Sequence, residues 1–288
     1  MKKCIIVIPI YKDTPSVVER ASFNQVLSIL KKHEICIVTY KECNLSVYKQ
    51  ISTIIEKTYS VEYFDKRFFA SIEGYNDLCY SRNFYLRFSS YEYMLIYQLD
   101  AWVFRDELLY WCCKGYDYIG APIFYIYDGN CYTNKFMGVG NGGFSLRKIS
   151  HCLNVLNSKP RHPIINFKGL VVMYWNLMLY NKKYSSLVNK LLIIPTILIK
   201  AIGFKNNLNY FVSSHKNEDA VFSIFTSERW GKFGNIPTEK EAMMFSFEVN
   251  PKLLFKINNN NLPFGCHAFE KYDYTDFWEN YIKIPYLL

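Results

Sequence analysis

The sequence predicts an α/β fold built around a mostly parallel sheet. Its first hundred residues alternate between strand-like and helix-like patterns, which is typical of parallel sheets. Cys4–Ile10 and Tyr93–Leu99 are continuous apolar runs, as expected for strands covered on both faces. The chain has 288 residues, of which 50% are apolar and 20% charged, a balance that suits a globular protein with a large core. Because no linker, repeat or low-complexity tract interrupts it, we expect one domain over residues 1–288.

The first half of the chain contains seven predicted elements. In chain order they are a strand at Cys4–Ile10, a helix at Pro15–Lys32, a strand at Ile35–Tyr40, a helix at Leu45–Lys57, a strand at Val61–Phe64, an aromatic helix at Asn76–Phe88 and a strand at Tyr93–Leu99. The helices are indicated by apolar residues that recur on one broad face. The last strand runs directly into Asp100. Ligands of open α/β sheets bind beyond the carboxyl ends of the strands, so an acid there is well placed for chemistry.

After Arg105 the pattern is less regular. The predicted features are a strand at Tyr116–Ile119, a loop at Gly120–Tyr132 with a turn at Asp128-Gly129-Asn130, a glycine cluster at Gly138–Gly143, a helix-like stretch to Leu156, a helical insertion over 157–215 and a C-terminal tail over 271–288. Within the insertion, Leu191–Phe204 is apolar except for Lys200. At about 14 residues it is too short to span a bilayer, which takes roughly 20. Two interpretations stay open, a buried helix pair and an interfacial helix beside the nearby basic pairs.

Charge and cysteine content exclude several classes of protein. Lys and Arg exceed Asp and Glu by 34 − 25 = 9, which suits phosphorylated ligands or an anionic lipid surface. The basic residues are scattered as pairs, an arrangement that argues against nucleic acid. The nine cysteines are odd in number and include no CxxC pair, so neither a disulfide scaffold nor a cysteine zinc site is expected. The short apolar run near the N-terminus is interpreted as a strand, and the protein as cytoplasmic.

Four short motifs contain residues that could take part in catalysis or ligand binding. They are Gln98-Leu99-Asp100, the glycine segment 138–147, Asn217-Glu218-Asp219 and Pro263–His267. Each has a structural alternative when taken alone. A strand-end Asp often caps a helix, glycines often form bare turns, acidic pairs often face solvent, and a lone His is usually structural.

Taken in order, the motifs resemble a known family. The matching stretches are Tyr97–Trp102, Tyr116–Pro122, Gly140–Arg147, Asn217–Asp219 and Pro263–His267. They look like a bacterial family of glycosyltransferase-like proteins that is catalogued only as a domain of unknown function. The resemblance covers roughly residues 4 to 270. That family is similar to GT-A glycosyltransferases, which implies a single GT-A-like nucleotide-binding domain with a mixed, mostly parallel sheet.

The resemblance also implies roles for individual residues. GT-A enzymes bind a divalent metal on the nucleotide diphosphate through a D-x-D motif at a strand end. Here Gln98 replaces the first acid, so Asp100 keeps the carboxylate, and His267 matches a late histidine ligand. Asp219 matches the catalytic base of the late acidic pair, with Glu218 as a sugar or acceptor contact. The candidates for binding the donor or its sugar, from the resemblance or from side-chain chemistry, are Gln98, Asn141, Gly142, Gly143, Arg82, Arg147 and Trp102. Structural pairing stays open for the arginines and core packing for the tryptophan.

Elementary chemistry makes these roles sensible. Transfer of a sugar from a nucleoside diphosphate leaves a diphosphate with added negative charge, which Mn²⁺ or Mg²⁺ stabilises as a Lewis acid. The acceptor hydroxyl loses its proton during attack, so an inverting displacement needs a carboxylate base. From the resemblance carried by the five ordered motifs, together with the strand-end Asp100, we expect a metal-dependent inverting glycosyltransferase of cell-surface polysaccharide synthesis that uses a glycan or lipid-linked acceptor. Peripheral association at the inner face of the membrane is an option.

Two alternatives stay open. A sugar nucleotidyltransferase is disfavoured because such enzymes grip a triphosphate with a glycine-rich loop after the first strand, whereas Tyr11–Pro15 contains no glycine. A degenerate transferase that only binds a glycan or nucleotide is the other alternative, because Gln98 has no carboxylate.

Overall fold

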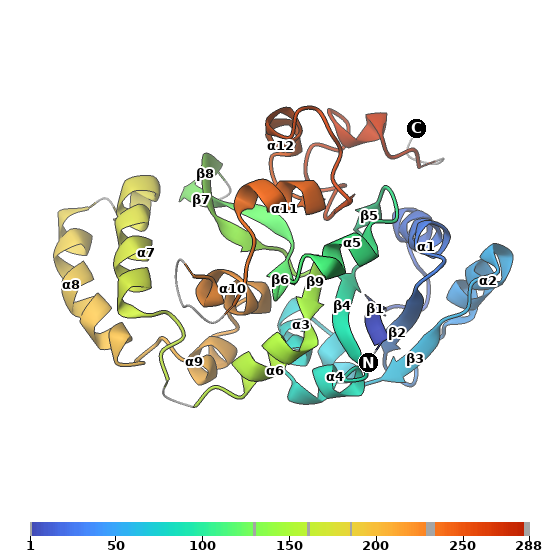
Figure 1. Cartoon of the computed structure of the whole chain (residues 1–288), viewed down its shortest axis with the longest axis horizontal. Helices are drawn as coiled ribbons and strands as arrows, with labels where there is room; N and C mark the ends of the chain where they lie inside the picture. The colour runs from blue at the N-terminus through green and yellow to red at the C-terminus, as the bar shows by residue number, and fades with distance from the viewer. Residues whose placement is uncertain (1, 129–130, 160–161, 185, 229–233, 285–288) are drawn as a thin grey trace.

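A six-stranded sheet forms the centre of the molecule. The computed structural model describes residues 2–128, 131–159, 162–184, 186–228 and 234–284 (Figure 1). The strand order is β3-β2-β1-β4-β9-β6. The bounds of these strands are β1 Lys2–Pro9, β2 Glu34–Thr39, β3 Ser60–Tyr63, β4 Tyr91–Tyr97, β6 Tyr118–Ile119 and β9 Phe144–Lys148. Strands β1 to β4 are parallel and β9 is antiparallel to both of its neighbours. The predicted α/β class with a mixed, mostly parallel sheet is therefore confirmed.

Helices cover both faces of this sheet because successive strand side chains point to opposite sides. In β1, Ile6 and Ile8 belong to one core cluster, and Ile5 and Val7 to the other. The first cluster is covered by α1 (Val17–Ile29), α2 (Ser46–Ile55) and α5 (Leu108–Cys113). The second is covered by α3 (Ile72–Cys79), α4 (Arg82–Arg87) and α6 (Ile149–Leu156). The continuous runs predicted as buried strands thus have a core on each side.

The helix predicted at Asn76–Phe88 is two helices, α3 and α4. Ser81 separates them, with an extended backbone (φ −78°, ψ 122°) at the N-cap of α4. Serine favours caps over helix interiors because its hydroxyl competes for backbone hydrogen bonds. The single-helix prediction was wrong at this point.

The loop predicted at Gly120–Tyr132 is also wrong. Strands β7 (Ala121–Asp128) and β8 (Cys131–Gly140) form an antiparallel ribbon beside the main sheet. Phe124 packs on Phe136 across the ribbon, with ring centroids 4.8 Å apart. Aromatic and β-branched residues favour strands, and here that preference prevails. Gly129 and Asn130 of the predicted turn lie outside the described residues.

A second, small sheet joins distant parts of the chain. Its order is β10 (Ser246–Phe247), β11 (Gly265–Cys266) and β5 (Trp102–Val103), with β10 and β11 parallel and β5 antiparallel. Helices α11 (Glu239–Phe245) and α12 (Pro251–Ile257) flank it. The predicted tail belongs to this core up to residue 284, because Trp278 in η4 (Trp278–Asn280) is fully buried and stacks on Phe104. All nine cysteines are free thiols.

The predicted insertion is helical in its described part. Its elements are α7 (Phe167–Tyr180), η2 (Lys182–Tyr184), α8 (Leu187–Ala201) and α9 (Leu208–Ser213), followed by α10 (Glu218–Phe222) and η3 (Ile224–Thr226). Helices α7 and α8 lie side by side at the end of the molecule opposite α2 (Figure 1). The interpretation of Leu191–Phe204 as a buried helix pair is wrong, since one helix runs through Pro195 and most of its apolar side chains are exposed. No helix in the described ranges is long and apolar enough to cross a membrane.

Candidate active site

The carboxyl edge of the main sheet brings two of the predicted motifs together. Strand β4 ends at Tyr97, so Gln98 and Asp100 follow it at this edge. Because β9 is antiparallel to β4 and Tyr97 pairs with Phe144, the loop before β9 lies at the same edge. The backbone N–H of Gln98 donates to the carbonyl of Gly143 at 2.8 Å. Two motifs more than forty positions apart therefore meet here.

The small sheet adds a histidine between two carboxylates. Parallel strands β10 and β11 end side by side, which places Glu248 next to His267, and antiparallel β5 starts at the same end, just after Asp100. The Nδ1 atom of His267 lies 3.0 Å from Oε1 of Glu248. Its Nε2 atom lies 3.1 Å from Oδ1 of Asp100 and 3.3 Å from Oε1 of Gln98. The sequence analysis missed Glu248, which belongs to no motif.

Opposite charges fix the protonation of this cluster. Burial lowers the pKa of His267, but the Asp100 and Glu248 carboxylates outweigh it and raise the pKa to about 10. Burial raises the pKa of Asp100, while His267 and, more weakly, Lys271 lower it below its ordinary value. The side chain of Asp100 is 44% exposed, so one ligand-capable carboxylate faces solvent.

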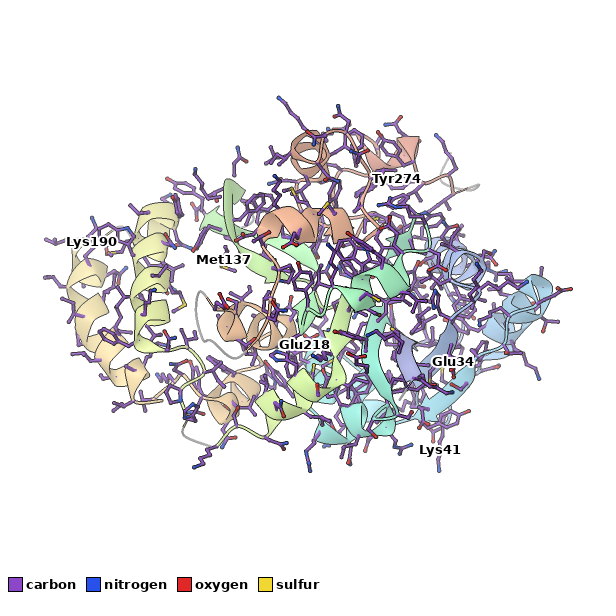
Figure 2. The ribbon with its side chains drawn as sticks, viewed as in Figure 1. Glu34, Lys41, Met137, Lys190, Glu218 and Tyr274 are labelled. Carbon is purple, nitrogen blue, oxygen red and sulfur yellow. The ribbon has the colours of Figure 1, made fainter. Side chains whose placement is uncertain are left out.

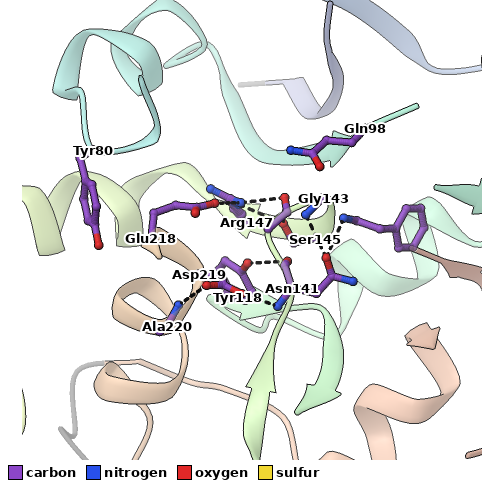
Figure 3. Close-up of polar contacts among 12 residues, drawn as sticks. Tyr80, Gln98, Tyr118, Asn141, Gly143, Ser145, Arg147, Glu218, Asp219 and Ala220 are labelled. Atoms are coloured by element: carbon purple, nitrogen blue, oxygen red, sulfur yellow. Dashed lines mark hydrogen bonds and ion pairs between the residues drawn. The ribbon is translucent and has the colours of Figure 1, made fainter. Parts of the chain in front are cut away.

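A second cluster contains the predicted acidic pair at the start of α10. Glu218 Oε1 forms an ion pair with Nη2 of Arg147 at 2.7 Å, and the two side chains are 4% and 0% exposed. Arg147 also donates to Ser145, Tyr85 and the carbonyl of Gly142. Its guanidinium is thus enclosed by protein, which fits the structural alternative and removes it from the donor-binding candidates (Figure 3).

Asp219 is held by backbone on both oxygens. Its Oδ2 accepts the N–H of Asn141 at 2.9 Å, and its Oδ1 accepts the N–H of Ala220 at 2.7 Å (Figure 3). Burial, followed by the charge of Glu218, raises the pKa of Asp219 to about 6. A carboxyl with such a pKa is ionised at neutral pH and is a stronger base than an ordinary aspartate.

The loop Asn141–Gly143 separates the two clusters. Asn141 has φ 82°, and its Oδ1 accepts the N–H of Gly143 at 2.9 Å. A Cβ on Gly142 would lie 2.8 Å from Oε1 of Glu218, and one on Gly143 would lie 1.9 Å from Nε2 of His267. A side chain at either position would therefore have to displace Glu218 or His267. Asp219 thus bonds the first residue of this segment and His267 lies against the third, and three residues span at most ~10 Å of chain.

Asn141 also carries an unused donor. It is 2% exposed, and its Nδ2 is buried with no hydrogen-bond partner in the described part of the protein. Buried polar atoms are rarely left unpaired, so this amide is suited to a ligand oxygen.

The remaining predicted residues lie apart from these clusters. Trp102 is 9% exposed and packs edge-on against Phe269, which is fully buried, so core packing describes it. Arg82 is exposed at the first residue of α4 and forms no ion pair with either cluster within the described ranges.

The donor set around His267 suits a hard divalent cation. It offers a carboxylate from Asp100, an amide oxygen from Gln98 and Nε2 of His267, which must release the proton that its raised pKa keeps on the ring before it can bind a cation. Glu248 bonds the other ring nitrogen, as a residue that orients a ligating imidazole does. Across the described residues, no group of three His, Cys, Asp or Glu side chains is arranged to hold a metal. The protein supplies two such ligands here, which fits Mg²⁺ or Mn²⁺ held jointly with substrate phosphates and water.

The sequence matches one family model. The family described as "Protein of unknown function (DUF5672)" matches residues 58–267. No protein among curated sequences matches.

Solved structures are similar over about half of the chain. S. aureus TarS has 9% identity and a TM-score of 0.34, covering 53% of this chain and 48% of that one. A 4-diphosphocytidyl-2C-methyl-D-erythritol synthase has 12% identity and a TM-score of 0.32, covering 54% and 79%. A cytidylyltransferase from Leptospira borgpetersenii has 9% identity and a TM-score of 0.30, covering 53% and 62%. At such scores none of them bears on the activity.

Proposed function

From the site of this chain, which belongs to the DUF5672 family of proteins of unknown function, we propose a glycosyltransferase that moves a sugar from a nucleoside diphosphate to a glycan or lipid-linked acceptor. The observation that carries the proposal is the loop Asn141–Gly143. Its first residue bonds Asp219, a carboxylate of raised pKa, and its third lies against His267 of the Asp100–His267 pair. A base for the acceptor and an anchor for the diphosphate are the two groups that this transfer requires.

Asp219 is the proposed general base. Each of its oxygens accepts one backbone N–H and keeps a further lone pair for the acceptor hydroxyl. In an inverting displacement the acceptor oxygen bonds to the anomeric carbon, the bond from that carbon to the diphosphate breaks, and the hydroxyl proton passes to Asp219. Glu218 assists from its ion pair with Arg147, because its buried charge helps to raise the pKa of Asp219.

Asp100, His267 and Gln98 are the proposed residues of the diphosphate side. When bound, Mn²⁺ or Mg²⁺ would act there as a Lewis acid that stabilises the departing diphosphate. Asp100 presents its exposed carboxylate, Gln98 an amide oxygen, and Glu248 orients the imidazole. The free Nδ2 of Asn141 is suited to donate to a hydroxyl of the donor sugar.

Donor screening tests the proposal. Purified protein is incubated with a panel of nucleoside-diphosphate sugars and Mn²⁺, and release of nucleoside diphosphate is measured. Asp219→Asn should lower the rate by about two to four orders of magnitude, the usual contribution of a general base. The matched control is Asp276→Asn, whose side chain is 69% exposed and pairs with Lys252 at the surface. Equal rates in both variants would contradict the assignment of the base.

Parallel incubations with other substrates separate the alternatives. Release of pyrophosphate when the protein is given a nucleoside triphosphate and a sugar phosphate would indicate a nucleotidyltransferase. Nucleotide binding without turnover by any donor would indicate the degenerate binding protein. Calorimetry completes the test, because Asp100→Ala and His267→Ala should each abolish any metal-dependent part of nucleotide affinity.

A further inference from the structure

Helices α7 and α8 form a hairpin whose outer surface is apolar. On α7, Phe167, Val171, Trp175 and Leu179 recur every fourth residue and are 42–60% exposed. On α8, six further apolar side chains are at least 56% exposed: Leu187, Val188, Leu191, Leu192, Ile194 and Leu198. Just after the helix, Ile202 and Phe204 are 78% and 59% exposed. Clusters of this size on an otherwise polar surface mark interaction sites.

The exposed apolar side chains of α7 and α8 form one continuous surface. A groove of about 270 Å³ between the helices is lined by side chains of both, which include Trp175 and Ile194. The hairpin does not need this surface for its own packing, because Leu170 and Tyr174 of α7 and Ile193 and Ile197 of α8 are buried in the core. The exposed apolar side chains are therefore available to contact a partner outside the chain.

The charge of this segment selects the partner. Residues 157–215 contain seven lysines, one arginine and no aspartate or glutamate, although the whole chain has 25 acidic residues. Lys168, Lys183, Lys190 and Lys205 are exposed, and Lys190 projects from the outer end of the hairpin (Figure 2). Near the base, burial and the charges of Lys205 and Lys216 lower the pKa of Lys200. Positive charge gathers here without a compensating acid in the segment.

This charge distribution disfavours a second copy of the chain as the partner. A symmetric contact through the hairpin would place lysines against lysines, and like charges repel. An apolar surface bordered by lysines is instead typical of helices that lie in a membrane interface, where the apolar side chains enter the acyl boundary and the lysines reach anionic headgroups.

We propose that the α7–α8 hairpin docks the protein on a membrane surface rich in anionic phospholipid. The helices lie on the bilayer and do not cross it. This inference stands apart from the proposed transferase activity, because it rests on the hairpin alone and is tested without substrate.

Vesicle binding tests it. The full chain is mixed with vesicles of phosphatidylcholine alone or with about one third phosphatidylglycerol, and bound protein is measured by flotation. Binding is expected to the anionic vesicles and to weaken as salt is raised from about 0.1 M to 0.5 M, where screening is stronger. Fluorescence gives a second readout, since Trp175 is 60% exposed and should shift to the blue on binding, a shift that Trp175→Phe should reduce.

Two pairs of variants locate the surface. Leu191→Glu with Leu198→Glu places charge in the apolar row and should reduce the partition coefficient more than tenfold. Its control is Ile54→Glu with Ile72→Glu, at sites that are 75% and 77% exposed outside the hairpin, which should bind like wild type.

Lysine variants measure the electrostatic part. Lys183→Gln and Lys190→Gln should each reduce the partition coefficient about fivefold, the equivalent of about 1 kcal/mol per basic residue at an anionic surface. Lys41→Gln and Lys49→Gln, which alter exposed lysines elsewhere, serve as the control.

Three results would overturn the proposal. They are absence of binding to anionic vesicles at low salt, binding that the Leu191→Glu, Leu198→Glu variant leaves intact, and a dimer in sedimentation analysis that this variant dissociates while vesicles have no effect. The variants all change exposed positions. Unchanged circular dichroism and thermal unfolding would establish that they are folded.

Discussion

Glu218→Gln probes the buried ion pair beside Asp219, the proposed base. Among the described residues, Glu218 is the one carboxylate paired with Arg147, whose side chain is 0% exposed. The substitution keeps the shape and leaves a guanidinium charge buried without its counter-charge. Breaking a buried pair from one side costs about 3–5 kcal/mol. With a urea m-value near ~3 kcal/mol per molar, the unfolding midpoint should fall by about 1–2 M.

A double-mutant cycle separates the pair from its surroundings. Arg147→Met alone also removes the bonds to Ser145, Tyr85 and the Gly142 carbonyl, but these losses are the same with or without Glu218→Gln and cancel in the cycle. The coupling energy should be at least about 2 kcal/mol. The exposed pair Arg87–Glu62 is the control, and Glu62→Gln should cost less than about 1 kcal/mol. Additivity within about 0.5 kcal/mol for Arg147 and Glu218 would refute the reasoning.

Two further predictions concern the loop and its base. Because the pKa of Asp219 is raised to about 6, the carboxyl is protonated below that pH, so kcat/KM should fall tenfold per pH unit on the acid side and level off above; a profile flat from pH 5 to 8 would contradict this. By the same shift, folded protein binds this proton more tightly than unfolded protein, so the group's contribution to stability is full below its ordinary pKa of 3.8 and is lost as the pH rises through about 6, as urea titrations at several pH values would reveal. Gly143→Ala should abolish metal-dependent nucleotide binding in calorimetry, because the added Cβ would meet His267 at 1.9 Å, whereas Gly138→Ala, with its nearest neighbour Ile224 at 3.4 Å, should leave binding unchanged.

Local patterns predicted the sheet because its central strands are unambiguous. Cys4–Ile10 and Tyr93–Leu99 are apolar at every or nearly every position, and they became β1 and β4 within two residues at each end. The ribbon β7–β8 could not be predicted in the same way. Its pairing begins at Ala121 and Gly140, and its register then shifts several times between Ile123 and Asp128. The apolar content of α8 was visible in the sequence, but which side of the helix faces solvent depends on packing against α7.

In the site, too, the local sequence indicated single residues, whereas contacts between residues far apart in the chain were visible only in the fold. Asp100 was indicated by its place after a buried strand, and the structure puts it at the sheet edge as expected. Arg147 and Glu218 are 71 positions apart, and only the fold shows that their charges neutralise each other in the core. The sequence had left Arg147 open between a diphosphate contact and a structural role.

Glu248 bears on the departure from the D-x-D pattern at Gln98. The small sheet brings Glu248 to the Nδ1 side of His267, while Asp100 and Gln98 lie on the Nε2 side. An acid at position 98 would add a third carboxylate around one imidazole, with like charges close together in a partly buried site. With the amide, the cluster keeps one carboxylate on each side of the ring and an oxygen at each position of the motif. The acid absent at residue 98 is thus matched by one that reaches the histidine from another strand, and no reading of the linear motif could have located it.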